Sequence, residues 1–267
     1  MSLIAVAVFD TEENKRSELT RLTLRSLIGS VDFTKHRLVI IDNNSCQNTK
    51  RIITDAALDL YVNFPNEGLN PWHLITLPEN IGTARAINQA WKLRHPSEHC
   101  IKMDNDIIIN QSGWVEEMEE AIRRDPNIGQ VGLKRKDCWE WPGHEHADWR
   151  SELHMLPHVP GEPWQIVEKV KHVIGSCAMH SAALLDKVGY LYQPSLYGYD
   201  DVIMSHRTHL AGFYSCFLPH INIDHIDPGD TPYQDWKQKH SGEQTQQVIN
   251  LVHEMYNGTK PIYYDAD

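Results

Sequence analysis

The chain has 267 residues, enough for one large domain or two modest ones with a substantial buried core. Its 36 Asp and Glu outnumber 25 Lys and Arg, and this net charge of −11 argues against a polybasic protein held to nucleic acid mainly by phosphate contacts. The hydrophobic fraction of 41% and the charged fraction of 23% are ordinary for a globular protein, so the composition disfavours extensive disorder.

The five cysteines are widely spaced and include no CxxC pair, so they indicate neither a zinc knuckle nor a disulfide framework. We therefore expect a reducing, cytoplasmic compartment. The apolar residues 1–9 are too few for a signal segment, and no stretch approaches the roughly 20 apolar residues of a membrane span. A membrane anchor is not predicted.

The first hundred residues alternate short apolar runs with helical patterns, which is typical of βα units around a mainly parallel sheet. Ligands of such sheets bind outside the carboxyl ends of the strands. Strands are predicted over residues 3–9, 37–41, 73–77 and 100–103, and helices over 17–28, 49–61 and 83–93. The overall prediction is an α/β fold with helices flanking the sheet.

Polar residues recur where these four strands end: Asp10, Asp42 with Asn43, Asn80, and Asp104 with Asp106. Asp and Asn are also common turn and cap residues, which is the alternative interpretation of each one. Four of them at the same structural place favour a single site of nucleotide size.

Asp104 and Asp106 directly follow a predicted strand. Residues i and i+2 of an extended segment point to the same side, so both carboxylates can face one cation. Two carboxylates, phosphate oxygens and water are the usual ligands of Mg²⁺ or Mn²⁺. A capped turn is the alternative for a DxD sequence taken alone.

The second half of the chain is less regular. A helix is predicted over residues 114–124 and a strand over 130–134, followed by an aromatic loop over 137–164 that holds four Trp and four His. Further strands are predicted over 167–174 and 214–218, and helices over 181–188, 202–210 and 244–256, the last an amphipathic closing helix. With no repeat or linker in the chain, we predict one domain, with subregions 1–110, 111–230 and a C-terminal helical tail at 231–267.

Two further groups in this half are candidates for chemistry. Asp200 and Asp201 follow Tyr199 at a predicted helix start, where acids often serve only as caps, but one carboxylate could accept a proton from a hydroxyl. His225 lies after the strand predicted at 214–218, and a neutral imidazole there could bind a metal or touch a phosphate. A hydrogen-bonded loop histidine is the commoner outcome.

The order of these motifs resembles the family-2-like glycosyltransferases of the GT-A fold over about residues 3–226. The most specific pieces are the run at residues 79–88, which begins Glu79-Asn80-Ile81-Gly82, and the DxD at 104–106. That family transfers a sugar from a nucleoside diphosphate sugar with inversion at the anomeric carbon. The resemblance implies a metal-dependent enzyme that uses Mn²⁺ or Mg²⁺.

The resemblance also implies a role for each matching position. The nucleotide sugar would be bound by Asp10, Asp42, Asn80, Arg85 and Asp104. The metal and diphosphate would be bound by Asp104, Asp106 and His225. Independently of the resemblance, Arg207, Lys102 and Arg85 are positive groups available to a diphosphate, although Lys102 lies inside a predicted strand, where a paired charge is the alternative. Asp201 matches the usual catalytic base, and Asp200 stands where Glu is commoner. The first loop departs from the family, because Asp10-Thr11-Glu12 replaces the familiar Pro-x-Tyr/Phe-Asn.

Trp139, Glu140 and Trp141 lie where acceptor-facing segments fall in the resembling family, and Tyr199 flanks the mouth of the site. Indole rings stack on both sugars and bases, so the acceptor could be a glycan, a small molecule or a hydroxymethylated DNA base. Alternatively, the tryptophans only fix the loop to the body.

Two other functions stay open. Sugar-nucleotide nucleotidyltransferases share the layout, but they usually carry a Gly-rich basic loop where this chain has acidic residues 10–13. A non-catalytic carbohydrate-binding protein is disfavoured by the intact Asp104, Asp106, Asp200 and Asp201.

Overall fold

The N-terminal apolar run forms β1 (Ser2–Val8), which pairs in parallel with β2 (Arg37–Asp42) and β4 (His99–Met103). Strand β3 (Trp72–Thr76) continues the parallel order beside β2. Both faces of β1 are buried, which is why its sequence is continuously apolar rather than alternating. The computed structural model describes residues 1–64, 71–137, 152–229, 232–242 and 244–266.

The second half makes the sheet mixed. Strand β9 (Cys177–His180) lies antiparallel between β4 and β6 (Ile128–Arg135), although residues 177–179 give no strand signal in the sequence. The strand predicted at 214–218 extends to β10 (Tyr214–His225), which runs parallel to β6. The remaining strands, β5 (Ile107–Ile108), β7 (Glu152–Met155) and β8 (Ile166–Val170), are all antiparallel to their neighbours.

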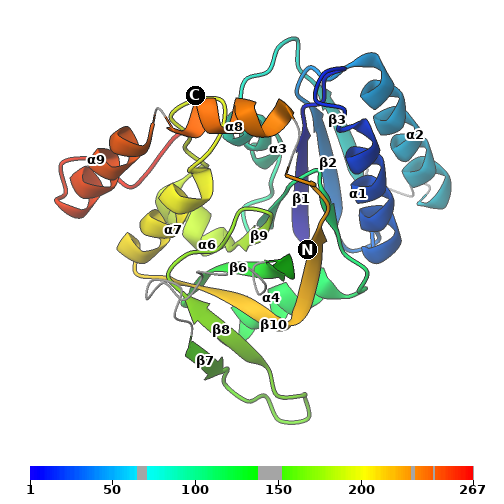
Figure 1. Ribbon diagram of the computed structural model, residues 1–267. Coiled ribbons are helices and arrows are strands. Elements are labelled where there is room, and N and C mark those ends of the chain that lie inside the picture. Colours follow the sequence, from blue (N-terminus) through cyan, green and yellow to red (C-terminus); the bar gives the residue numbers. More distant parts are fainter. Residues whose placement is uncertain (65–70, 138–151, 230–231, 243, 267) are drawn as a thin grey trace.

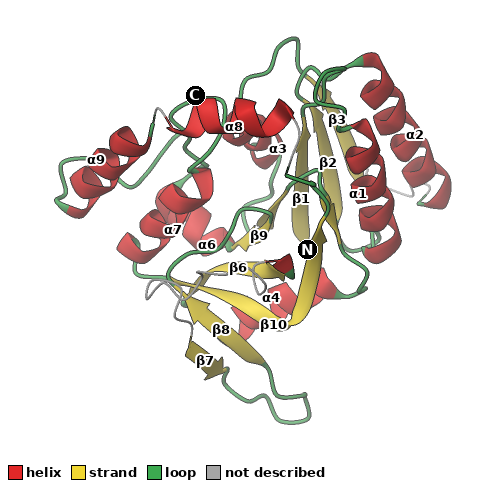
Figure 2. Cartoon of the chain, in the orientation of Figure 1, coloured by secondary structure: helices red, strands yellow, loops and turns green. Residues whose placement is uncertain are grey.

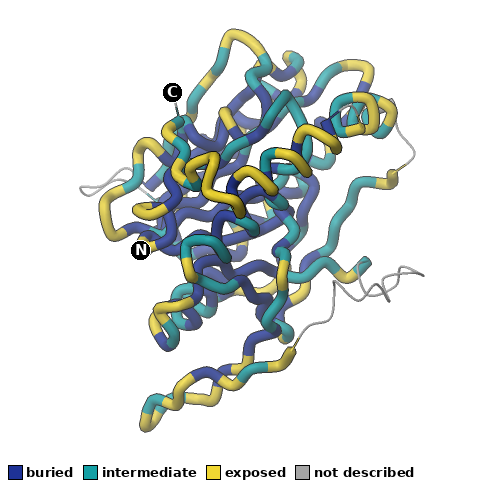
Figure 3. The backbone as a smooth tube through the Cα atoms, turned by 90° about the vertical axis from the view of Figure 1, so that its left-hand side faces the viewer, coloured by how far each residue is buried: buried dark blue, intermediate teal, exposed yellow. Residues whose placement is uncertain are grey.

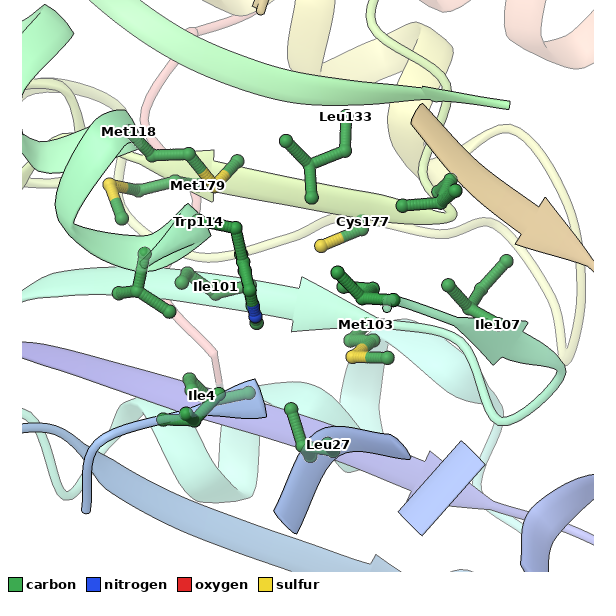
Figure 4. Close-up of a cluster of buried hydrophobic side chains, with 14 of the residues drawn as sticks. Ile4, Leu27, Ile101, Met103, Ile107, Trp114, Met118, Leu133, Cys177 and Met179 are labelled. Atoms are coloured by element: carbon green, nitrogen blue, oxygen red, sulfur yellow. The ribbon is translucent and has the colours of Figure 1, made fainter. Parts of the chain in front are cut away.

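Helices cover both faces of this sheet (Figures 1 and 2). One face packs against α1 (Ser17–Ser30), α2 (Gln47–Asn63) and α4 (Trp114–Arg124), and the other against α3 (Thr83–Trp91) and α6 (Ala182–Val188). Successive strand residues point to opposite faces, so Ile4 joins the first core and Leu3 the second. Figure 4 shows Ile4, Leu27 and Trp114 packed together in the first core. The predicted α/β fold is confirmed.

The C-terminal tail is helical, as predicted, but contains two helices rather than one. The closing helix α9 (Thr245–Tyr256) packs Val248 and Val252 against Ile203 of α7 (Asp200–Leu210). The other, α8 (Pro232–Gly242), has a polar sequence that gave no amphipathic signal.

Buried residues lie in the middle of the molecule and exposed ones on its outside (Figure 3). Across the residues that the structure describes, no helix combines the length and the apolar character needed to cross a membrane. The cysteines at positions 46, 100, 177 and 216 are free thiols.

Candidate active site

A cleft of about 790 Å³ opens where β1, β4 and β6 end, the edge at which ligands of parallel sheets bind. Its walls include six of the predicted site residues: Asp104, Asp106, Tyr199, Asp200, Asp201 and His225. These residues are up to about 120 positions apart in the chain and meet because the strand ends and the start of α7 lie at the same edge of the sheet. The fold therefore brings the predicted metal-binding and catalytic residues together.

Asp106 is the most deeply buried acid of the DxD motif. Its Oδ2 lies 2.6 Å from Nη2 of Arg16 and 3.4 Å from Nε2 of His225. Burial by itself raises the pKa of Asp106, but the hydrogen bond from His225 and the charges of His225 and Arg16 hold that pKa well below its usual range. The carboxylate is therefore ionised throughout the physiological range.

Asp106, His225 and Asp227 form a group that can hold a metal ion. One ligand atom from each lies within 4.8 Å of the others. Oδ1 of Asp106 is buried and has no hydrogen-bond partner among the described residues, so it is available as a ligand. Two carboxylate oxygens and one imidazole nitrogen suit Mn²⁺ or Mg²⁺. No sequence signal singled out Asp227, apart from its position two residues after His225.

Asp104 has different contacts from this group. Its Oδ1 is 3.2 Å from Nζ of Lys102, which also lies 3.1 Å from Oδ2 of Asp200. Burial raises the pKa of Asp104 to about 6, although the ammonium of Lys102 opposes the shift. The structure thus joins the first acid of DxD to the first acid of the Asp200-Asp201 pair.

Asp201 lies in the first turn of α7 and remains accessible from the cleft, with 24% of its side chain exposed. Its Oδ2 accepts a hydrogen bond of 3.0 Å from the Gly175 amide, and its Oδ1 accepts one of 2.8 Å from the amide of Val202. Nε2 of His172 lies 3.6 Å from Oδ2. The two backbone amides therefore fix the orientation of the carboxylate, which is still accessible to a ligand in the cleft.

Tyr199 precedes α7 and lines the cleft. Its hydroxyl and that of Thr245 are 2.6 Å apart, which ties the start of α7 to α9. Trp139, Glu140 and Trp141, the other predicted acceptor residues, lie outside the described residues.

Four of the predicted donor-binding residues are not part of the cleft wall. Asp10 is fully buried and accepts hydrogen bonds from Thr20, Thr49 and Asn105. Burial raises the pKa of Asp10. It therefore supports the DxD turn from behind, which corrects the expectation of direct contact with a nucleotide.

The other three are Asp42, Asn80 and Arg85. Asp42 is buried and accepts from the Ser45 amide at 2.7 Å, so it caps the turn after β2. Arg85 is exposed on α3 and lies outside the cleft wall. Asn80 bonds to Asn43, and Asn43 does line the cleft.

Residues 79–82 begin the run that carries the resemblance, and packing explains part of their sequence. Oδ1 of Asn80 accepts from the amide of Gly82 at 3.0 Å. Gly82 has a φ of +88°, and a Cβ there would lie 3.0 Å from the Cα of Leu196. Only glycine fits this close approach, whatever the ligand.

Arg207 does not face the cleft, which corrects its suggested role at a diphosphate. It is buried and donates to the backbone carbonyls of Val188, Tyr190 and Ile262. Its position ties the chain after α9 to the end of α6.

Helix α8 supplies cleft residues that no sequence signal identified. The ring of Tyr233 lies 4.3 Å from the guanidinium of Arg16, and Nζ of Lys237 lies 2.9 Å from Oδ2 of Asp227. Arg16 contacts Asp227 as well, at 2.8 Å. Two cations therefore face the carboxylates of the metal-binding group.

An α/β domain with a DxD motif at a strand end, a histidine beside it and an acid pair joined to the motif through Lys102 is typical of a glycosyltransferase of the GT-A type. The family model "Glycosyl transferase family 2" matches residues 13–189, which is more than half of the chain. The chain belongs to this family, and the prediction from the sequence is confirmed.

Solved structures with the same fold include a mannosyltransferase, PcManGT from Pyrobaculum calidifontis, in complex with GDP-Man and Mn²⁺. It has a TM-score of 0.63 at 17% identity, with 88% of this chain and 59% of that chain covered. S. aureus TarS 1–349 has a TM-score of 0.58 at 17% identity, covering 86% and 62%. GalNAc-T7 with UDP, GalNAc and Mn²⁺ has a TM-score of 0.58 at 16% identity, covering 86% and 45%.

The chain thus spans about three fifths of the length of the first two of these proteins. At such low identity the likeness concerns the fold. No curated protein matches the chain.

Proposed function

We propose that the protein is a metal-dependent, inverting glycosyltransferase that moves a sugar from a nucleoside diphosphate sugar to an acceptor hydroxyl. The observation that carries this proposal is the meeting of the Asp106, His225 and Asp227 group with Asp201 in one cleft. Family membership supports the reaction class. The chemistry follows from these side chains.

Asp106, His225 and Asp227 would hold the divalent cation. When bound, the cation stabilises the negative charge that develops on the departing diphosphate. The neighbouring Arg16 and Lys237 add positive charge on the same side of the cleft. This wall therefore suits the phosphate end of the donor.

Asp201 would act as the catalytic base. The acceptor oxygen bonds to the anomeric carbon while the bond from that carbon to the diphosphate breaks, and the acceptor proton passes to Asp201. A base must lie within hydrogen-bond reach of the proton that it accepts, so the orientation of the Asp201 carboxylate is decisive. The amides of Gly175 and Val202 provide that orientation.

The donor class is supported by the ligands named for the structures of the same fold, which include GDP-Man, UDP-GlcNAc, and UDP with GalNAc. They carry different bases and sugars, so they do not select one donor for this chain. The acceptor is a glycan, a small molecule or a hydroxymethylated DNA base. A cytoplasmic location stays a prediction.

The proposal can be tested by incubating nucleoside diphosphate sugars, one at a time, with Mn²⁺ and a pool of acceptors of the three kinds. We expect a nucleoside diphosphate to be released with one donor, the product to have inverted anomeric configuration by NMR, and EDTA to stop the reaction. Release of pyrophosphate from a nucleoside triphosphate and a sugar phosphate would instead indicate a nucleotidyltransferase. Glycan binding without any turnover would indicate a carbohydrate-binding protein.

A further inference from the structure

One short connector, residues 174–176 between β8 and β9, contacts three functional parts of the cleft at once. The amide of Gly175 donates to Oδ2 of Asp201 at 3.0 Å, and the carbonyl of Gly175 accepts from Nζ of Lys102 at 3.0 Å. The next carbonyl, that of Ser176, accepts from the amide of Asp104 at 2.9 Å. The connector therefore joins the DxD turn to the start of α7.

Lys102 is the side chain that completes this link. It lies on β4 with only 6% of its side chain exposed. Its Nζ donates to the Gly175 carbonyl at 3.0 Å and forms ion pairs with Oδ1 of Asp104 at 3.2 Å and Oδ2 of Asp200 at 3.1 Å. A buried charge persists only when it is paired in this way. Because the ammonium is buried and surrounded by these three groups, we expect Lys102 to act through them rather than by touching a substrate.

The fit around Gly175 is tight. A Cβ at this position would lie 2.7 Å from Nζ of Lys102 and 3.1 Å from Cβ of Asp201. Any larger residue would therefore push away Lys102, which binds the Gly175 carbonyl, and Asp201, which binds the Gly175 amide.

We propose that Lys102 is a positioning residue, which fixes the position of Asp201 relative to Asp104 through the backbone of Gly175. The inference rests on the proposed function, in which Asp201 receives the acceptor proton, and on the expectation from the sequence that Asp104 binds the nucleotide sugar. A misplacement of about 1 Å between reacting groups can lower a rate on the order of 100-fold, so the relative position of these two carboxylates matters for turnover.

Lys102 should affect turnover but not metal binding. The group formed by Asp106, His225 and Asp227 does not include Lys102 or Asp104, and its own neighbouring cations are Arg16 and Lys237. Removing the Lys102 ammonium should therefore lower kcat without weakening Mn²⁺ binding. A merely structural ion pair would show no such split.

Lys134 offers a matched control. Its Nζ lies 2.7 Å from Oε1 of Glu168, and the two side chains are 14% and 6% exposed, but neither residue lines the cleft. Lys102→Met and Lys134→Met each remove a largely buried ammonium that is paired with a carboxylate. Gly175→Ala tests the same link while keeping every charge.

The experiment measures urea unfolding, Mn²⁺ affinity by electron paramagnetic resonance, and kcat and donor KM for these three variants. For Lys102→Met and Gly175→Ala we expect kcat to fall about 10- to 100-fold, with donor KM and Mn²⁺ affinity changed less than about threefold. Lys134→Met should lose comparable stability, yet keep kcat within about twofold of the wild type.

If Lys102→Met does not fold, the double variant Lys102→Met/Asp200→Asn removes the uncompensated charge, and we expect it to fold but to keep the low kcat. Wild-type kcat in Gly175→Ala or in either Lys102 variant would overturn the inference, as would parallel losses of kcat and Mn²⁺ affinity. Absence of turnover in the wild-type protein would instead overturn the proposed function, and the inference with it.

Discussion

The guanidinium of Arg16 lies 2.6 Å from the carboxylate of Asp106, although 90 residues separate them in the chain. Both side chains are almost completely buried, so each charge depends on the other. The same guanidinium contacts Asp227, and Arg16 and Lys237 together offset the charges of the two carboxylates. The acidic side of the cleft is therefore held in place by charges built into the fold.

Asp106 is predicted to be essential for metal binding. Asp106→Asn should weaken Mn²⁺ binding by at least about tenfold, because it removes a charged ligand while keeping the shape of the side chain. Titration of Mn²⁺ followed by electron paramagnetic resonance measures this. Asp224→Asn is the control, since Asp224 pairs with Lys136 at 2.7 Å and lies outside the cleft wall. Equal affinity in the two variants would remove Asp106 from the metal-binding group.

Asp201 is predicted to act in turnover rather than in donor binding. Asp201→Asn should lower kcat by about 10²- to 10⁴-fold, because an amide cannot accept the acceptor proton. Donor affinity by calorimetry should stay close to the wild-type value. The matched control is Asp186→Asn, in which the replaced carboxylate is 60% exposed and pairs with Arg94. Full activity in the Asp201 variant would rule out the assignment of this residue as the base.

Arg207 is predicted to stabilise the fold. Arg207→Met leaves three backbone carbonyls, those of Val188, Tyr190 and Ile262, without their donor. The free energy of unfolding should fall by about 3 kcal/mol or more, measured in urea. Arg123→Met, which removes a guanidinium that is 52% exposed, should lower the free energy of unfolding far less. Similar losses in both variants would contradict this account of Arg207.

His180 is predicted to make stability depend on pH. Burial lowers the pKa of His180 from 6.5 to about 3, so the folded protein holds this ring neutral. The contribution to stability is present above pH 6.5 and is lost as the pH falls toward 3, because the unfolded chain binds the proton first. Between pH 7 and pH 5 this amounts to about 2 kcal/mol.

Urea unfolding of His180→Gln at both pH values tests this dependence. The variant should lose less stability on acidification than the wild type, by about the same 2 kcal/mol. His220→Gln serves as the control, because that side chain is 46% exposed. An unchanged pH dependence in His180→Gln would show that the ring titrates normally in the folded protein.

The parallel half of the fold could be predicted from the sequence because its strands are apolar runs that end in polar turns. Strand β9 could not, because it has only four residues and directly follows Gly175 and Ser176, which are typical of a loop. Helix α8 was missed because its sequence is polar, and its contacts to the cleft come from single side chains such as Tyr233 and Lys237.

Only part of the candidate site could be predicted from the sequence. Asp104, Asp106 and Asp201 could be found because each follows a strand or begins a helix in a recognisable motif. Arg16 and Asp227 are 211 residues apart, and nothing in a linear sequence indicates that they form an ion pair. Asp10 shows the reverse case, because a polar residue at a strand end can turn inward and bond to Thr20 as readily as it can face a ligand.

In the proposed function the cleft binds a nucleoside diphosphate together with a divalent cation. This binding can be measured by calorimetric titration of UDP, GDP, ADP, CDP and dTDP into the protein, with Mn²⁺ and again with EDTA. We expect at least one of them to bind with Mn²⁺, and both EDTA and Asp106→Asn to abolish this binding. Failure of all five to bind with Mn²⁺, or equal binding in EDTA and in the Asp106 variant, would contradict the proposed function.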